Sequence, residues 1–214
     1  MSRRLVLWRH GRTEWNATRR FQGQIDVALD DIGRAQARQA AAQLAQLPPT
    51  AIVASDLSRA QDTAAALSGL TGLPVGTDER LRETDAGSWQ GLGREELVAA
   101  HGEELAAWAA GSDLRPGGGE RRSEVAARMV AAIDDALLTL GDGGTLVVVT
   151  HGGAARAAVG SLLDLRVAHW AILGVLTNCA WTVLSEQPAG SGMRWRLEEY
   201  NARSLPQTAF GDDR

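Results

Sequence analysis

The feature that most constrains the fold is an alternation of short apolar runs with segments of helical periodicity. Val147, Val148 and Val149 form a continuous apolar run, which is typical of a strand buried on both faces of a sheet. Strand-like runs occupy residues 5–8, 51–54, 146–150, 180–184 and 194–197, with a weaker candidate at 74–77. Helical patterns cover about 37–47, 58–70, 95–110, 123–140 and 154–163. This alternation predicts an α/β sandwich around a mostly parallel sheet.

The length of 214 residues predicts one domain over residues 1–214. Residues 89–120 stand apart, because two tryptophans and a helical pattern lead into a proline followed by three glycines. We interpret this region as a helical excursion that covers one end of the sheet. We expect the tail, residues 204–214, to be poorly ordered or to lie over the mouth of a site.

Composition argues against several functional classes. The net charge of −4 and the scattered arginines give no support for nucleic-acid binding. The apolar run at residues 5–8 is too short for a signal peptide, and no stretch reaches the roughly 18 apolar residues that a membrane-spanning helix needs. Cys179 is the only cysteine, which suits a reducing cytoplasm, and we interpret it as a buried small residue rather than a reactive thiol. We therefore expect a cytoplasmic protein with neither nucleic acid nor membrane as a partner.

Two predicted strands are followed by similar short motifs, RHG at residues 9–11 and THGG at residues 150–153. Ligands of open α/β sheets bind beyond the carboxyl ends of the strands. If the two strands are neighbours, His10 and His151 face one pocket. The glycine after each histidine allows an anion to approach the backbone, and the N–H groups that open the following helix suit a negative charge.

Two further segments are expected at the same edge. Arg59 falls in the first turn of a predicted helix, where a cation opposes the helix dipole, so an anionic ligand explains it better than helix stability does. Glu83 follows another extended run. Two histidines, two arginines (Arg9 and Arg59) and one carboxylate suit phosphoryl transfer through a phosphohistidine, with the guanidinium groups on the phosphoryl oxygens and the carboxyl group as proton donor.

A metal site is the alternative for the same residues. His10, His151 and Glu83 are of the right types to bind a metal ion. Arg9 and Arg59 argue against it because they would repel a cation at close range. We therefore expect no metal and no cofactor.

Five stretches together resemble the histidine phosphatase superfamily, also called the phosphoglycerate-mutase-like fold. They read, in order, LVLWRHGRTEWN, DIGRAQA, SDLSRAQDTA, LRETDAGSWQG and VVVTHGG, and the similarity spans about residues 4–200. The resemblance implies a three-layer α/β/α sandwich with a six-stranded, mostly parallel sheet and one antiparallel strand. It also implies that the first strand stops at residue 10 because His10 is the phosphate-accepting nucleophile.

The same resemblance implies roles for further residues. Arg9, Arg59 and His151 would form the phosphate pocket with His10, and Glu83 would donate the proton. Residues implied to contact phosphate or the rest of the substrate are Asn16 and Gln22, with Thr13 and Gly152 as second-rank candidates. Many relatives read Gly-Gly-Glu-Ser after the excursion, whereas this chain has Arg121 at the last of these positions.

Three functional classes remain open: a phosphomonoesterase, a cofactor-dependent phosphoglycerate mutase, and a non-catalytic protein that binds a phosphorylated ligand. The short excursion carries few basic residues, so the site is less enclosed than in the mutases, which favours transfer to water and hence a phosphatase. Further stretches, VAHWAILGVLTNCAWTVL and MRWRLEEYNA, resemble the actinobacterial glucosyl-3-phosphoglycerate phosphatases, which implies that substrate and a homodimer. A broad-specificity phosphatase of small metabolites remains an alternative.

The excursion is expected to set the choice of substrate. Trp89 and Trp108 would stack on a sugar or else anchor the excursion, residues 117–119 would form a flexible hinge, and Arg121 would meet a carboxylate.

Overall fold

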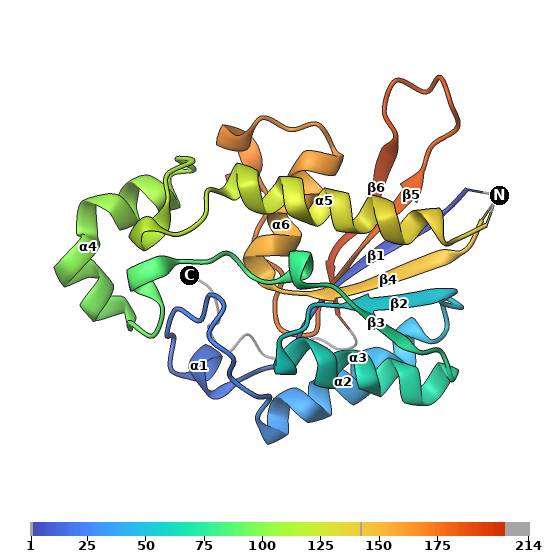
Figure 1. The fold of residues 1–214 in the computed structure, drawn as a ribbon, viewed down its shortest axis with the longest axis horizontal. Helices are drawn as coiled ribbons and strands as arrows, with labels where there is room; N and C mark the ends of the chain where they lie inside the picture. The colour runs from blue at the N-terminus through green and yellow to red at the C-terminus, as the bar shows by residue number, and fades with distance from the viewer. Residues whose placement is uncertain (1, 142, 204–214) are drawn as a thin grey trace.

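The computed structural model describes residues 2–141 and 143–203. Six strands form one sheet in the order β3-β2-β4-β1-β5-β6 (Figure 1). The strands are β1 (Arg4–Arg9), β2 (Ala51–Ala54), β3 (Val75–Thr77), β4 (Thr145–Thr150), β5 (Trp181–Glu186) and β6 (Trp195–Ala202). Strand β5 is antiparallel to both β1 and β6, whereas the pairs β1–β4, β2–β4 and β2–β3 are parallel. The predicted mostly parallel sheet with one antiparallel strand is confirmed.

Helices lie at the five positions that the periodicity predicts. They are α2 (Asp31–Leu44), α3 (Ser58–Thr71), α4 (Arg94–Ala109), α5 (Arg122–Leu138) and α6 (Gly152–Leu162). A short α1 (Glu14–Ala17) and the 3-10 turns η1 (Glu79–Leu81), η2 (Gly87–Trp89), η3 (Pro116–Gly118) and η4 (Val167–Ile172) complete the set. Helix α2 begins earlier than predicted because the Asp30 carboxylate caps it, accepting the Gly33 N–H at 2.7 Å.

The sheet is covered on both faces, which gives the predicted three layers (Figure 1). Alternate residues of β1 point to opposite faces, as the pleat of a strand requires. Leu5 and Leu7 pack in the core cluster that includes α5 and α6, whereas Val6 and Trp8 pack in the cluster that includes α2 and α3. Strand β4 divides its side chains in the same way, so the continuous valine run is buried on both sides.

Helix α4 lies beyond the end of the sheet, at the left of Figure 1. A small apolar cluster joins it to the rest of the chain; it contains Ala86, Trp89 and Leu97, with Phe21, Leu92, Leu105 and Trp108 packed against them. The expected flexible hinge at residues 117–119 is wrong, because this segment packs backbone to backbone on the turn η2. A Cβ atom at Gly119 would lie 2.1 Å from the Asp85 carbonyl oxygen, and one at Gly117 would lie 2.4 Å from that of Ala86.

Two expectations concern parts of the chain away from this core. The tail at residues 204–214 lies outside the described residues. Among the residues that the structure describes, no helix is long and apolar enough to cross a membrane.

A contact between two glycines fixes the loop that follows β1. A Cβ atom at Gly33 would lie 2.0 Å from the Arg12 carbonyl oxygen, and one at Gly11 would lie 2.4 Å from the Gly33 carbonyl oxygen. The first turn of α2 therefore presses directly on the backbone next to His10. Backbone atoms give way less easily than a side chain does, so neither glycine has room for a methyl group.

We expect Gly33→Ala to lower the free energy of unfolding by about 1–3 kcal/mol, because the added methyl group overpacks this backbone contact. The matched control is Gly69→Ala in α3, where a Cβ atom would have no neighbour within 4 Å. That change should raise the free energy of unfolding by about 0.5–1 kcal/mol, since alanine is the better helix former. Urea unfolding of both variants measures the two effects, and equal stabilities would contradict the proposed contact.

Candidate active site

The two histidine-bearing strands are neighbours, as their sequences predict. Strands β1 and β4 pair in parallel with Arg9 opposite Thr150, so His10 and His151 follow at the same edge of the sheet. Their ring centroids lie 5.1 Å apart with the planes inclined by 59°.

A cavity of about 300 Å³ opens beside this edge. Seven of its lining residues were predicted from the sequence as site residues: Arg9, His10, Asn16, Gln22, Arg59, Glu83 and Gly152. Trp108, expected to stack on a sugar or else to anchor the excursion, also lines it. The residues that sequence reasoning missed are Arg20, Phe21, Gly23, Thr84, Gly153, Arg156 and Val175. Four arginines and one carboxylate make this lining suited to an anion.

His10 is held as a neutral ring with one nitrogen available. Nδ1 lies 2.7 Å from the Gly11 carbonyl oxygen, which only accepts hydrogen bonds, so the proton resides on Nδ1 and Nε2 keeps its lone pair. Burial lowers the pKa of His10 well below 6.5, and the charges of Arg59 and Arg9 lower it further. A neutral imidazole nitrogen in an anion-binding cavity can act as a nucleophile.

His151 lies behind the cavity instead of lining it. The ring is fully buried, and both nitrogens have protein partners: Arg59 Nε donates to Nδ1 at 3.2 Å, and Nε2 lies 3.0 Å from Ser55 Oγ. Nε2 therefore carries the proton and donates to the serine. Burial, followed by the charge of Arg59, lowers the pKa of His151 well below 6.5. In this arrangement His151 orients Arg59 and packs against His10.

Arg59 is almost completely buried near the start of α3. It donates to the carbonyl oxygens of Gly23 and Ile25 at 2.8 Å each, besides its bond to His151. Burial lowers the pKa of its guanidinium group to about 10, although the charges of Glu83 and Asp26 oppose that shift. Arg59 thus stays charged at neutral pH.

Arg9 reaches the cavity from the end of β1, and the glycine at 152 makes room for it. Its Nη1 donates to the Leu176 carbonyl oxygen at 2.6 Å. A Cβ atom at residue 152 would lie 3.3 Å from Arg9 Nε and 2.7 Å from Val175 Cγ1. Gly152 therefore serves the site by its lack of a side chain.

Glu83 occupies the N-terminus of α6. Its carboxylate accepts N–H groups from Gly153 at 2.9 Å and from Ala154 and Thr84 at 2.8 Å each. The sequence predicts that the N–H groups opening this helix would meet a ligand anion, whereas two of them meet the protein's own carboxylate. This anchoring fixes the carboxyl group at the wall of the cavity.

Asn16 and Gln22 line the cavity, and Thr13 holds them there. The Asn16 side-chain oxygen accepts the Thr13 N–H at 3.1 Å and the Asn178 amide at 3.2 Å, and the Gln22 side-chain oxygen accepts the Thr13 hydroxyl at 3.0 Å. Both amides therefore keep NH₂ groups as donors for a ligand. Thr13 itself is fully buried and does not line the cavity, so its predicted contact with substrate is wrong.

Of the two roles expected for Trp89, the structure favours the anchor, because Trp89 is fully buried in the small apolar cluster. Arg121 does not line the cavity and donates to the Asp113 carbonyl oxygen at 2.8 Å. Trp108 does line the cavity, and the Arg122 guanidinium lies 4.2 Å from the centroid of its ring.

The most informative residue that sequence reasoning missed is Arg156 on α6. It follows Gly153 by three positions, which places both residues on one face of the helix, so this spacing was an available signal. Val175 and Ser55 lie on loops and carried no comparable signal.

Other reactive groups are accounted for. Burial raises the pKa of the Cys179 thiol, so the interpretation of this residue as a buried, unreactive cysteine is consistent with its environment. Within residues 2–141 and 143–203, no group of three or more histidine, cysteine, aspartate or glutamate side chains could hold a metal ion.

Comparison with known families identifies the fold. The model of the histidine phosphatase superfamily (branch 1) matches residues 5–203. The chain belongs to this superfamily. The resemblance stated from the motifs is therefore confirmed, and membership in this superfamily indicates a phosphoric monoester hydrolase.

Individual histidine phosphatases are similar over nearly the whole chain. A glucosyl-3-phosphoglycerate phosphatase of Mycolicibacterium vanbaalenii is 42% identical, with coverage of 94% of this chain and 95% of the relative. One of Mycobacterium tuberculosis is 44% identical, with the same coverage. A solved mycobacterial glucosyl-3-phosphoglycerate phosphatase in complex with inorganic phosphate has a TM-score of 0.87 at 41% identity and covers 94% of this chain and 98% of that one.

The two neutral histidines predict a pH dependence of stability. In the unfolded chain each takes up a proton near its ordinary pKa of 6.5, but the folded protein does not, because both pKa values are lowered. Stability is therefore complete above about pH 7 and falls as the pH drops below 6.5, by up to about 1.4 kcal/mol per pH unit for each histidine.

Urea unfolding between pH 5.5 and 8 tests this expectation. The pH dependence should be weaker in His10→Ala by the contribution of one histidine. Gly69→Ala, a change outside the cavity that removes no titratable group, should keep the wild-type dependence. A wild-type stability that does not change over this range would contradict the neutral state of both rings.

Proposed function

We propose that this histidine phosphatase hydrolyses phosphate monoesters through a phosphohistidine at His10 Nε2. The observation that carries the proposal is the state of His10: a neutral ring whose Nδ1 proton is bound to the Gly11 carbonyl oxygen, at the wall of a cavity with four arginines. That hydrogen bond also stabilises the positive charge that the ring acquires when Nε2 is phosphorylated.

The proposed reaction has two steps. In the first, the Nε2–phosphorus bond forms as the bond from phosphorus to the ester oxygen breaks, and the Glu83 carboxyl group gives its proton to the departing alkoxide. In the second, water attacks phosphorus, Glu83 takes up a proton of that water, and the Nε2–phosphorus bond breaks to release inorganic phosphate. Arg9 and Arg59 stabilise the phosphoryl oxygens in both steps, with Asn16 and Gln22 as further donors. His151 acts through its bond to Arg59.

Hydrolysis is favoured over mutase activity by the surroundings of the cavity. Helix α4 carries four glutamates, at residues 95, 96, 103 and 104, and a single arginine, Arg94, so it is a poor partner for a polyanionic cofactor. A mutase must hold its phosphorylated cofactor and exclude water until the phosphoryl group has returned to the substrate.

We further propose glucosyl-3-phosphoglycerate as the substrate. Two curated relatives that match 94% of this chain bear that name. Arg156 supplies a cation to the cavity in addition to Arg9 and Arg59, which suits the carboxylate of a phosphorylated sugar acid. The Trp108 ring, which also lines the cavity and is contacted by the Arg122 guanidinium, is a candidate surface for the sugar.

The working form is proposed as a metal-independent homodimer in the cytoplasm. Arginines take the place that a metal ion would have in stabilising the phosphoryl group, the single cysteine suits a reducing compartment, and the resemblance to the actinobacterial phosphatases supports the dimer.

His10→Ala should abolish phosphate release from every ester, by several orders of magnitude, because a methyl group cannot form the covalent intermediate. Wild-type protein quenched during turnover in buffer with EDTA should carry an acid-labile, base-stable phosphoryl label, and the variant should carry none. Substantial turnover by the folded variant, or a requirement of the wild type for a divalent ion, would refute the mechanism.

Arg156→Ala should lower kcat/KM for glucosyl-3-phosphoglycerate about tenfold or more, since a charge-assisted hydrogen bond is lost. Turnover of p-nitrophenyl phosphate, which has no carboxylate, should change less than about twofold. The matched control is Arg121→Ala, which removes an arginine outside the cavity and should affect neither substrate. Parallel losses on both substrates, or no wild-type preference for the glucosylated ester, would point to a broad-specificity phosphatase.

A further inference from the structure

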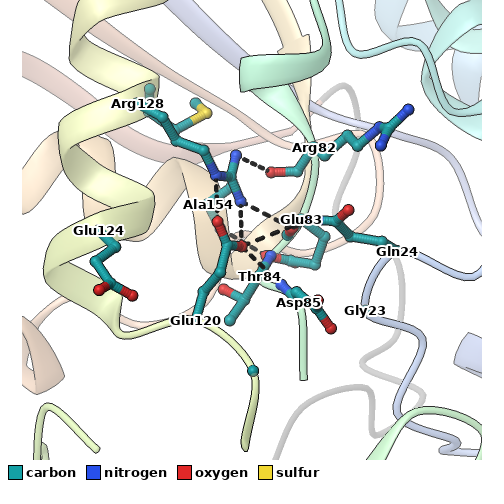
Figure 2. A network of polar contacts seen from close by, with 12 residues as sticks. Gly23, Gln24, Arg82, Glu83, Thr84, Asp85, Glu120, Glu124, Arg128 and Ala154 are labelled. Carbon is teal, nitrogen blue, oxygen red and sulfur yellow. Dashed lines mark hydrogen bonds and ion pairs between the residues drawn. The ribbon is translucent and has the colours of Figure 1, made fainter. Parts of the chain in front are cut away.

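The segment that carries Glu83 has no regular secondary structure of its own. It runs between the turns η1 and η2, and Glu83 is anchored on one side by the N-terminus of α6. The other side of the segment faces a charged pair: Arg128 from α5 and Glu120 from the residues just before that helix lie against its backbone (Figure 2).

Arg128 donates hydrogen bonds to the backbone carbonyl groups of this segment. Its Nη1 donates to the carbonyl oxygens of Arg80 and Arg82 at 2.7 Å each, and its Nη2 donates to that of Glu83 at 2.9 Å. One guanidinium group thus binds three carbonyl oxygens within four residues of the chain, including that of Glu83 itself.

Glu120, the negatively charged member of the pair, binds both Arg128 and the backbone of the segment. Its carboxylate accepts Arg128 Nε at 2.9 Å on one oxygen, and Arg128 Nη2 and the Asp85 N–H at 2.8 Å each on the other. The Glu120 N–H also donates to the Asp85 carbonyl oxygen at 2.8 Å, so backbone and side chain of Glu120 both hold the segment just after Glu83. Gln24 also donates to the Glu83 carbonyl oxygen, at 3.1 Å.

The pair is ionised and largely withdrawn from water. The side chains of Arg128 and Glu120 are only 18% and 24% exposed. Burial alone would raise the pKa of Glu120, but the bonds from Arg128 and from the Asp85 N–H outweigh it, and the pKa is lowered. Charge-assisted hydrogen bonds between such groups are the strong ones in proteins, so the segment is held stiffly.

We propose that Glu120 and Arg128 are positioning residues for the Glu83 carboxyl group, which they reach through its backbone. This inference rests on the proposed role of Glu83 as proton donor. Because α6 binds its side chain, and Arg128 and Glu120 bind the backbone of its segment, Glu83 has little freedom to move away from the leaving oxygen. Loss of the pair frees one of these two sides, and displacements of about 1 Å can cost catalysis up to about 100-fold.

The test compares two kinds of ester. An alkoxide leaving group needs a proton, whereas p-nitrophenolate leaves with little help. Arg128→Met should lower kcat/KM about tenfold for the alkyl phosphate that wild type hydrolyses fastest and less than about twofold for p-nitrophenyl phosphate. The ratio kcat/KM reports formation of the phosphoenzyme and leaves out its hydrolysis, the step that both esters share. In a Glu83→Ala background, Arg128→Met should cause no further loss that is selective for the alkyl ester.

A matched control separates positioning from stability. Arg3 and Glu186 form another partly buried pair, 2.6 Å apart and with side chains 27% and 17% exposed, at the opposite end of β1. Arg3→Met should lower the melting temperature, yet leave the ratio of alkyl to aryl turnover at its wild-type value.

The outcomes distinguish the inference from the proposed function. If Glu83→Ala lowers kcat/KM equally for both esters, the proton-donor role fails and the inference fails with it. If Glu83→Ala is selective but Arg128→Met slows both esters equally, or neither, only the inference is overturned. Should Arg128→Met not fold, Glu120→Gln replaces it: the same selective loss is expected, and equal losses on both esters overturn the positioning role.

Discussion

Strands β1 and β4 pair in parallel with Arg9 opposite Thr150, and this pairing sets the positions of the side chains that line the cavity. The backbone ladder delivers His10 and His151 side by side, and the loops and helices that follow each strand bring the rest. Because the two strands are buried on both faces, this register is strongly specified: a slip by one residue would exchange the apolar side chains between the two core clusters. The most deeply buried part of the protein is therefore also the part that sets the distances in the site.

A charged arginine, Arg59, and two neutral histidines are buried together at this edge of the sheet. Their hydrogen-bond partners explain how this is possible. Arg59 satisfies its donors on the carbonyl oxygens of Gly23 and Ile25 and on His151, which must stay unprotonated at Nδ1 to accept. His10 is neutral for a related reason, since burial and two nearby guanidinium groups oppose its protonation. The site is thus electrostatically prepared for a dianionic phosphate before any ligand arrives.

The sequence predicts the fold well because its signals are local. Unbroken apolar runs, helical spacing and the two histidine motifs define each element and bring Arg9, His10, Arg59 and Glu83 to one edge, which the structure confirms as a single cavity. The failures concern properties that arise only from packing. The sequence leaves open whether Trp89 stacks on a ligand or anchors the excursion, and only its packing against α4 favours the anchor. Thr13 and His151 lie one layer behind the residues that line the cavity. Arg156 was within reach from helical spacing, whereas Val175 comes from a loop whose path depends on the complete fold.

The manner in which Glu83 is bound has a consequence for how such a protein can diverge. Its carboxylate relies on main-chain N–H groups, which every residue except proline supplies, so the bond from Ala154 does not depend on its side chain, which is instead buried in the core. Gly153 is the exception, because a Cβ atom there would lie 2.7 Å from Glu83 Oε1. Arg156, one turn further along the same helix, contributes only through its side chain. Mutations at Arg156 can therefore change which substrate the cavity binds, while the N-terminus of α6 continues to hold the Glu83 carboxylate in place.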